Sequence, residues 1–181
     1  MKYNVPMEIK ENEAVSELLK YIKPNSTVLE FGCANGRMTR YMKEQLGCDV
    51  YIVEYEKDAF NDAIKFAKDG VCGDILAYEW LEKYKGIKFD HIVFADVLEH
   101  LSDPQQALAK TSGILKEDGN VLISVPNIGH NDVLIKLFEG KFEYTDVGLL
   151  DNTHIHFFAE NSLESFCQNA GYQIIKKRYI K

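Results

Sequence analysis

A glycine loop between an apolar segment and a helix-like segment is the part of this sequence best suited to bind a ligand. The stretch from Thr27 to Thr39 reads TVLEFGCANGRMT, with Gly32 and Gly36 in the loop and Cys33 beside the first glycine. In an open α/β sheet, a strand that ends in such a loop at a helix N-terminus forms a binding crevice. Glycine lets the backbone come close to a ligand, and the unpaired N–H groups of the helix favour an anion. We therefore expect backbone contacts to a ligand here, Cys33 included.

The glycine spacing and two acidic residues further along narrow the choice of ligand. Dinucleotide sites use G-x-G-x-x-G at a pyrophosphate, whereas three residues separate Gly32 from Gly36 here. Glu54 ends the next strand-like segment, 22 residues after Gly32, where a carboxylate can accept both hydroxyls of a ribose. Asp74 follows a third such segment. The alternatives are a solvent-exposed strand-end carboxylate for Glu54 and a helix N-cap for Asp74, which could serve as cap and ligand contact at once.

Three histidines are candidates for chemistry. His100 follows the fourth strand-like segment, and imidazole titrates near neutral pH, so His100 is the best candidate for a general base. A helix-capping or cofactor-pocket role for His100 is slightly favoured over a base. His154 and His156 would share a face of an extended segment, and with Asp151 they could form a metal site. We favour a substrate-facing or structural role for this pair, with His156 as the second catalytic candidate and with no metal.

These residues require a regular alternation of strands and helices to position them. Hydrophobic periodicity and turn signals predict strands over 27–31, 49–54, 71–73, 89–96 and 120–126, with a turn over 116–119. Helices are predicted over 15–22, 37–46, 57–68, 75–84 and 103–115. This rhythm predicts an α/β fold with a doubly wound, mostly parallel sheet and helices on both faces.

The rhythm breaks after Pro126. Residues 127–151 contain one short predicted helix over 133–138, flanked by glycines, and a last helix over 161–170 precedes a final strand over 172–180. Long irregular segments near the ligand edge of a sheet are often lids. We therefore expect residues 1–181 to form one domain, with 127–158 as a lid or acceptor-side insertion. The aromatic residues of that segment could line an apolar pocket or pack among themselves.

Four motifs together resemble one enzyme family. The pattern Glu30-x-Gly32-x-x-x-Gly36 resembles motif I of the class I S-adenosylmethionine (SAM) methyltransferases. FADVLEHLSDP, with Asp96, Glu99 and His100, resembles the segment after the fourth strand in ubiquinone-biosynthesis-type methyltransferases. DGNVLISVPN and THIHFF resemble later motifs of that group and of small bacterial SAM methyltransferases. The resemblance covers residues 10–175, and the order and spacing of the motifs are more specific than any one of them.

The resemblance implies a Rossmann-like fold, S-adenosyl-L-methionine as the cofactor, and methyl transfer by in-line displacement. It implies that the glycine loop holds the amino-acid end of the cofactor, that Asp74 bonds the adenine amino group, and that Ile75 packs on the ring. The cofactor-binding residues expected on this basis are Glu30, Gly32, Cys33, Gly36, Glu54, Tyr55, Asp74, Ile75, Asp96 and Val97. One departure concerns the C-terminal hairpin of the family sheet, because only one strand's length of chain follows the last helix. The hairpin is then either truncated, with the seventh strand missing, or completed by a strand from a partner.

Composition and charge bear on the acceptor and the location. The net charge is −7, from 21 basic and 28 acidic residues, and an acidic balance disfavours a large nucleic-acid footprint. No apolar run approaches the roughly 20 residues needed to span a bilayer, and the four cysteines include no C-x-x-C pair. We expect a cytoplasmic protein with a small-molecule methyl acceptor, without nucleic-acid or membrane partners, and with a homodimer as an open option.

Two other functions fit parts of the pattern. A NAD(P)-dependent oxidoreductase shares the architecture, but the glycine spacing and the D-V-L-E-H-L segment argue against it. A non-catalytic SAM-binding module that acts through a partner is compatible with the short C-terminus. The leading interpretation is a SAM-dependent methyltransferase.

Overall fold

The structure is a computed structural model that describes residues 13–180. The chain divides into two compact units, which are described separately. The described residues of the first unit are 13–95, 110–124 and 179–180, and the second unit comprises 96–109 and 125–178. The first unit contains the sheet, and the second contains most of the irregular chain.

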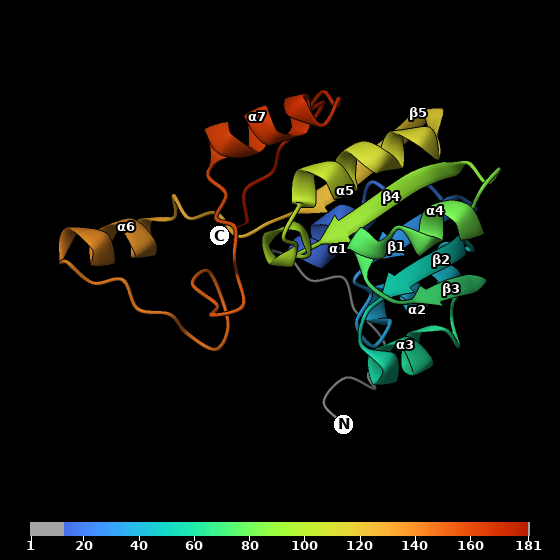
Figure 1. Ribbon diagram of the computed structural model, residues 1–181, viewed down its shortest axis with the longest axis horizontal. Coiled ribbons are helices and arrows are strands. Elements are labelled where there is room, and N and C mark those ends of the chain that lie inside the picture. The colour runs from blue at the N-terminus through green and yellow to red at the C-terminus, as the bar shows by residue number, and fades with distance from the viewer. Residues whose placement is uncertain (1–12, 181) are drawn as a thin grey trace. The chain divides into compact units, whose positions relative to one another are not determined.

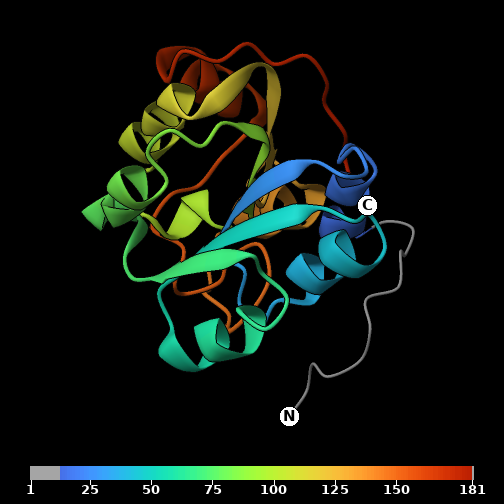
Figure 2. The same cartoon turned by 90° about the vertical axis from the view of Figure 1, so that its right-hand side faces the viewer.

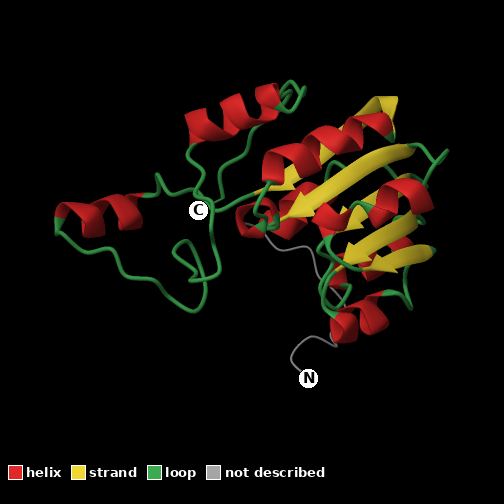
Figure 3. Cartoon of the chain, in the orientation of Figure 1, coloured by secondary structure: helices red, strands yellow, loops and turns green. Residues whose placement is uncertain are grey.

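The first unit is built on five parallel strands (Figures 1 and 3). Their order across the sheet is β3-β2-β1-β4-β5, and every neighbouring pair is parallel. The strands are β1 (Thr27–Phe31), β2 (Asp49–Glu54), β3 (Asp69–Cys72), β4 (Phe89–Ala95) and β5 (Leu115–Ser124). The predicted α/β class with a parallel sheet is confirmed. Because the strands are parallel, the turns that follow β1, β2 and β3 lie at one edge of the sheet.

One face of the sheet packs on three helices, α1 (Ala14–Leu19), α2 (Arg37–Glu44) and α3 (Lys57–Ala63). Figure 2 shows α1 and α2 on the same side of the strands. The core on this face combines alternate strand residues with helix residues. It contains Leu18, Leu19, Ile22, Val28, Cys33, Met38, Met42, Cys48, Val50, Ile52, Ala63 and Val93. Burial of these apolar side chains is the main force that fixes the helices to the sheet.

The opposite face of the first unit has an aromatic core. The Phe31 ring stacks on Phe94 with centroids 4.6 Å apart and meets Trp80 edge-on at 4.9 Å. Trp80 lies in α4 (Glu79–Lys83), which follows the 3₁₀ helix η1 (Ile75–Ala77). Each such ring pair contributes about 0.5–1.5 kcal/mol beyond the area that it buries. The helix predicted over 75–84 is instead two short helices, η1 and α4, which are separated at Tyr78. The φ of Tyr78 is 58°, in the left-handed region.

Most predicted elements are present, with shorter helices than the periodicity suggested. The helix predicted over 57–68 ends at Ala63, because β3 begins at Asp69 and the chain must turn before it. The helix predicted over 103–115 is α5 (Pro104–Lys110) followed by η3 (Thr111–Gly113). The turn predicted over 116–119 is a bulge within β5. Leu115 pairs with Phe89 and Asn120 pairs with His91, so between these two pairs β5 has three more residues than β4.

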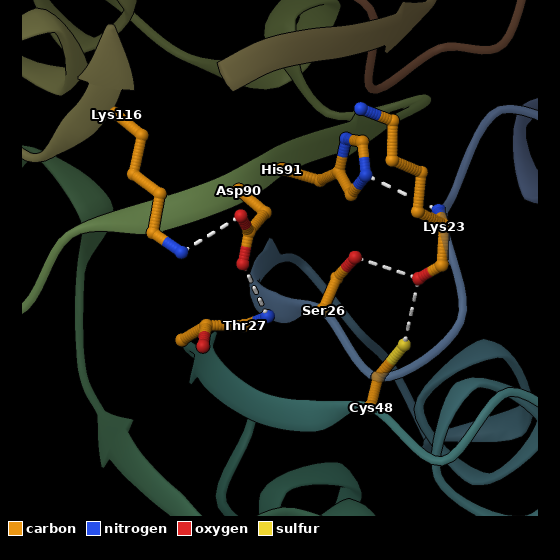
Figure 4. Close-up of polar contacts among 7 residues, drawn as sticks. All are labelled: Lys23, Ser26, Thr27, Cys48, Asp90, His91 and Lys116. Atoms are coloured by element: carbon orange, nitrogen blue, oxygen red, sulfur yellow. Dashed lines mark hydrogen bonds and ion pairs between the residues drawn. The ribbon is translucent and has the colours of Figure 1, made fainter. Parts of the chain in front are cut away.

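Polar contacts hold the starts of β1 and β4 together (Figure 4). The Asp90 carboxylate accepts the Thr27 amide at 2.8 Å and pairs with the Lys116 ammonium at 2.7 Å. Burial alone would raise the pKa of Asp90, but the bonds from Lys116 and Thr27 outweigh it and lower that pKa. His91 Nε2 accepts the Lys23 amide at 3.2 Å, and burial lowers the pKa of this imidazole. These contacts stabilise the end of the sheet away from the glycine loop.

The second unit contains η2 (Leu98–His100), most of α5, α6 (Asn131–Phe138) and α7 (Glu160–Asn169). Single β-bridges join Asn127 to Phe158 and Thr145 to Asp151. The predicted final strand over 172–180 is wrong, since none of these residues is in a strand. Within this unit, Lys177 instead pairs with Glu160 and Glu164 of α7. None of the helices described in residues 13–180 has the length and apolarity needed to cross a membrane.

Candidate functional site

The glycine loop follows β1 directly and has an unusual backbone. Gly32, Ala34 and Gly36 all have positive φ, at 64°, 47° and 78°. The Gly32 amide donates to the carbonyl of Val53 in β2 at 2.9 Å, and the Gly36 amide donates to Cys33 at 2.9 Å. A Cβ on Gly36 would lie 2.6 Å from the Cα of Ala63. The loop itself therefore requires glycine at position 36 and favours it at position 32, before any ligand is considered.

Glu54, at the end of β2, is bonded to that loop. One carboxylate oxygen accepts the Ala34 amide at 2.8 Å, and the other accepts the Glu56 amide at 2.9 Å. The side chain is buried rather than solvent-exposed. Each carboxylate oxygen has two lone pairs, so both can accept one further hydrogen bond. Glu54 thus links the turns after β1 and β2 and retains the capacity to accept two hydroxyl groups.

Glu30 lies inside the first unit rather than in the loop. Its side chain is only 3% exposed and accepts a 2.6 Å hydrogen bond from the hydroxyl of Thr39 in α2. The pKa of Glu30 is raised to about 7, chiefly by burial; the Thr39 bond acts to lower it, and the negative charge of Glu54 contributes to the increase. Glu30 therefore ties β1 to α2 beneath the glycine loop. Thr39 had no role in the sequence analysis, although its place in the first turns of α2 could have indicated one.

The turns after β2 and β3 carry three more predicted residues. Tyr55 is 69% exposed, directly after Glu54. The Gly73 amide donates to the Glu54 carbonyl at 2.9 Å, which joins the two turns. Asp74 caps η1 by accepting the Leu76 amide at 2.8 Å, so the N-cap alternative is confirmed. Ile75 is buried. The structure therefore brings Gly32, Glu54 and Asp74 to the same edge of the sheet.

Cys33 has no nucleophilic character in this setting. Its side chain is buried, and burial raises the pKa of the thiol, with further increases from the charges of Glu30 and Glu54. The nucleophilic form of cysteine is the thiolate, which this environment disfavours. Cys33 and the other three cysteines are free thiols.

Asp96 and Val97 immediately follow β4 and belong to the second unit. Asp96 is exposed with a φ of 53°, a left-handed conformation that is uncommon for a residue with a side chain. Val97 is buried. Strained backbone is concentrated at functional sites in proteins, so the turn after β4 is a candidate for ligand contact.

Two of the three candidate histidines in the second unit, His100 and His154, lie close together. The rings of His100 and His154 have centroids 4.8 Å apart at an interplanar angle of 68°. His156 is half-buried, and its backbone amide donates to the Glu99 carbonyl at 3.0 Å. The Asp151 carboxylate accepts the hydroxyl and the amide of Thr153 and is not one of the three ligand-type groups that lie together, which are Glu99, His100 and His154.

The aromatic residues of 127–158 separate into different environments. Phe142, Tyr144 and Phe157 form one cluster with ring centroids 5.5–6.4 Å apart. Phe158 packs on Phe166 of α7 at 5.2 Å, whereas Phe138 is 91% exposed. Packing of these aromatic residues on one another therefore accounts for part of the high aromatic content of residues 127–158.

The parallel sheet, the glycine loop and the strand-end carboxylate define a Rossmann-like protein of the nucleoside-binding type. Residues 3–177 match the model of a family described as a methyltransferase domain. The chain therefore belongs to that family, within the class I SAM-dependent methyltransferases.

Individual proteins are similar to this chain in sequence or in fold. The chain is 29% identical over 184 residues to a tRNA U34 carboxymethyltransferase of Campylobacter hominis, covering 93% of this chain and 61% of that protein. It is 25% identical over 162 residues to a ubiquinone biosynthesis O-methyltransferase of Burkholderia pseudomallei, covering 87% and 68%. The crystal structure of a SAM-dependent methyltransferase from Archaeoglobus fulgidus superposes with a TM-score of 0.65 at 20% identity, covering 88% and 66%. The chain thus spans about three fifths of the length of the first relative.

Proposed function

We propose that this chain is a methyltransferase domain that transfers a methyl group from SAM to a small-molecule acceptor. The observation that carries the proposal is the link between the glycine loop and Glu54, made by the 2.8 Å bond from the Ala34 amide. It joins an element suited to the amino-acid end of SAM to a carboxylate suited to its ribose. Family membership makes SAM the nucleoside in question.

The donor set fits this cofactor. Glu54 would accept the two ribose hydroxyls, and the backbone of Gly32, Cys33 and Gly36 would contact the methionine end. Glu30 would act beneath the loop by holding α2 through Thr39. The remaining residues proposed to contact the cofactor lie in the turns after β2, β3 and β4 and are Tyr55, Asp74, Ile75, Asp96 and Val97.

Bound SAM supplies a methyl group already activated on a sulfonium, so the protein's main task is to position donor and acceptor in line. In that geometry the acceptor atom would bond to the methyl carbon as the carbon–sulfur bond broke, and the electron pair of the broken bond would stay on sulfur. Where the acceptor carries a proton, a base must accept it. His100 and His156 are the candidates within the second unit.

A small-molecule acceptor is favoured by charge and by the residues after β4. The net charge of −7 disfavours binding to a polyanion. Amino-directed DNA and glutamine methyltransferases typically carry N-P-P-Y-like residues after the fourth strand, whereas Asp96, Val97 and Leu98 follow β4 here. Because one relative is named as a tRNA-modifying enzyme, tRNA is the necessary competing acceptor in any test.

The test has two stages. Calorimetry with SAM, S-adenosylhomocysteine and NAD should show binding of the first two and none of NAD, and the reverse would overturn the methyltransferase assignment. Turnover with labelled SAM should then be detected on phenols, amines or sugars and be absent on tRNA. Labelling of tRNA alone would overturn the small-molecule acceptor. SAM binding without turnover on any acceptor would favour the non-catalytic module.

A further inference from the structure

Two segments of the second unit that are distant in sequence bring three potential metal-ligating side chains together. Glu99 and His100 lie in η2, and His154 comes from the segment before α7. One ligand-type atom from each of the three lies within 4.8 Å of the others. Carboxylate oxygen and imidazole nitrogen are common ligands of divalent transition ions.

The Glu99 carboxylate has no partner in its buried position. The residue is 1% exposed, and neither carboxylate oxygen accepts a hydrogen bond from any residue in 13–180. A buried carboxylate without a partner is costly, and it requires either a proton or a cation.

The two histidines each have one ring nitrogen already engaged. His100 Nδ1 lies 3.2 Å from the Thr153 carbonyl oxygen, and His154 Nδ1 lies 3.4 Å from the Leu149 carbonyl oxygen. The Thr153 hydroxyl oxygen also lies 3.2 Å from His100 Nδ1. A carbonyl only accepts, so in the tautomer that makes both carbonyl bonds each Nδ1 carries the proton and each Nε2 keeps its lone pair. Metal-binding histidines typically have this arrangement, in which the outer hydrogen bond fixes the tautomer.

The backbone holds the two segments in register. The amides of Ile155 and His156 donate to the Glu99 carbonyl at 2.9 Å and 3.0 Å. Asp151 accepts the Thr153 hydroxyl at 2.7 Å, which orients the residue that contacts His100. The three side chains are therefore set on a preorganised framework within one unit.

We propose that Glu99, His100 and His154 bind one divalent transition ion, of the Zn²⁺, Co²⁺ or Mn²⁺ type, through one carboxylate and two Nε2 atoms. Bonds of about 2.0–2.2 Å place ligand atoms roughly 3–3.5 Å apart, so atoms at the 4.8 Å limit must approach one another by about 1.3–1.8 Å. His100 is exposed and can make that adjustment. Three protein ligands leave coordination positions open for water or a ligand atom. A bound Nε2 of His100 cannot accept a proton, which leaves His156 as the candidate base.

The test is metal binding itself. The purified chain is stripped with chelator and titrated with Co²⁺, followed by visible absorption, and with Zn²⁺ by calorimetry. We expect one ion per chain and at least 100-fold weaker binding in Glu99→Gln, His100→Gln and His154→Gln. His130→Gln is the matched control, because His130 is a half-exposed histidine of the same unit whose Nδ1 lies 3.7 Å from the Asp132 carboxylate, and this variant should bind the metal as the wild type does.

Several outcomes would overturn the site. They are the absence of saturable Co²⁺ or Zn²⁺ binding, equal affinity in the three variants, or displacement of Co²⁺ by an equal concentration of Mg²⁺, which prefers oxygen ligands. If Glu99→Gln fails to fold by circular dichroism, the exposed His100→Gln variant still decides. Metal binding is measured without methyl transfer, so failure here leaves the proposed function standing, and failure of that function leaves this site standing.

Discussion

Two nearby glutamates of the first unit illustrate how much the environment of a single residue decides. Glu54 accepts two backbone amides, whereas Glu30 is buried with one hydroxyl donor. The sequence placed both at strand ends and predicted cofactor contact for both. It could not reveal that Glu30 points into the α2 face, because the partner Thr39 is nine residues away and on another element. Nor could it reveal that Glu54 supports the glycine loop, which depends on the register of β1 and β2.

The first prediction concerns Glu54. Glu54→Ala removes the proposed acceptor of two ribose hydroxyls together with the anchor of the Ala34 amide. Loss of a charge-assisted contact costs about 1.5–3 kcal/mol, which is roughly a 10- to 150-fold weaker SAM affinity. Glu56→Ala is the matched control, since that exposed carboxylate is two residues away. Calorimetric titration measures both, and equal SAM affinity in Glu54→Ala and the wild type would remove Glu54 from the site.

The second prediction concerns the pH dependence of stability from Glu30. Its pKa of about 7 in the folded protein exceeds the ordinary 4.5, so the folded protein binds more protons between these pH values. The stabilising contribution is therefore present below pH 4.5 and is lost as the pH rises through 7. Glu30→Gln should be about 2–3 kcal/mol more stable than the wild type at pH 8, with the difference vanishing near pH 4.5.

Urea unfolding across this pH range measures the effect of Glu30→Gln. The control is Glu44→Gln, which removes a half-exposed carboxylate paired with Arg40 on the same helix. Exposed pairs of this kind contribute at most about 1 kcal/mol. A Glu30→Gln protein that is less stable than the wild type at pH 8 would show that the ionised carboxylate is stabilising there.

At the scale of elements, the segment that contains β1, the glycine loop and α2 was predicted with nearly correct boundaries. The apolar run before Gly32 and the amphipathic pattern after Gly36 are local patterns, and local patterns can be identified directly in a sequence. Only part of the reason why residue 36 is a glycine could be predicted from the sequence. The glycine is also where α2 approaches Ala63 of α3, a contact between elements that no local pattern records.

The third prediction separates that contact from backbone strain. Gly36→Ala introduces a Cβ 2.6 Å from the Ala63 Cα at a φ of 78°. Gly86→Ala is the matched control, because Gly86 has a similar φ of 85° with nothing within 4 Å of the added atom. Strain alone costs about 1–2 kcal/mol, and overpacking adds about 1–3 kcal/mol. Urea unfolding should therefore show a larger loss for Gly36→Ala, and equal losses would contradict the close packing of α2 on α3.

For the whole molecule, the alternation of strands and helices was sufficient to predict a parallel sheet. It failed at 172–180, where apolar and basic residues resemble a strand but form none. A strand is stable only when it is hydrogen-bonded to a neighbouring strand, and the sequence of a segment does not show whether such a neighbour is available. The same limit explains the site around Glu99. The sequence grouped Asp151 with His154 and His156, whereas folding brings Glu99 and His100 to His154.

The last prediction concerns residues 127–158, which we propose to become ordered when ligands bind. Within this part of the second unit, few side chains are buried, and Phe138 and Val147 are strongly exposed. Segments with few buried contacts open at low free-energy cost, and ligand-gated segments are drawn from that class. Hydrogen exchange should therefore be faster at 139–149 than in β1 and β2, and S-adenosylhomocysteine with an acceptor should slow it. Strong protection of 127–158 without ligand, unaltered on addition, would identify the segment as a fixed structural cap.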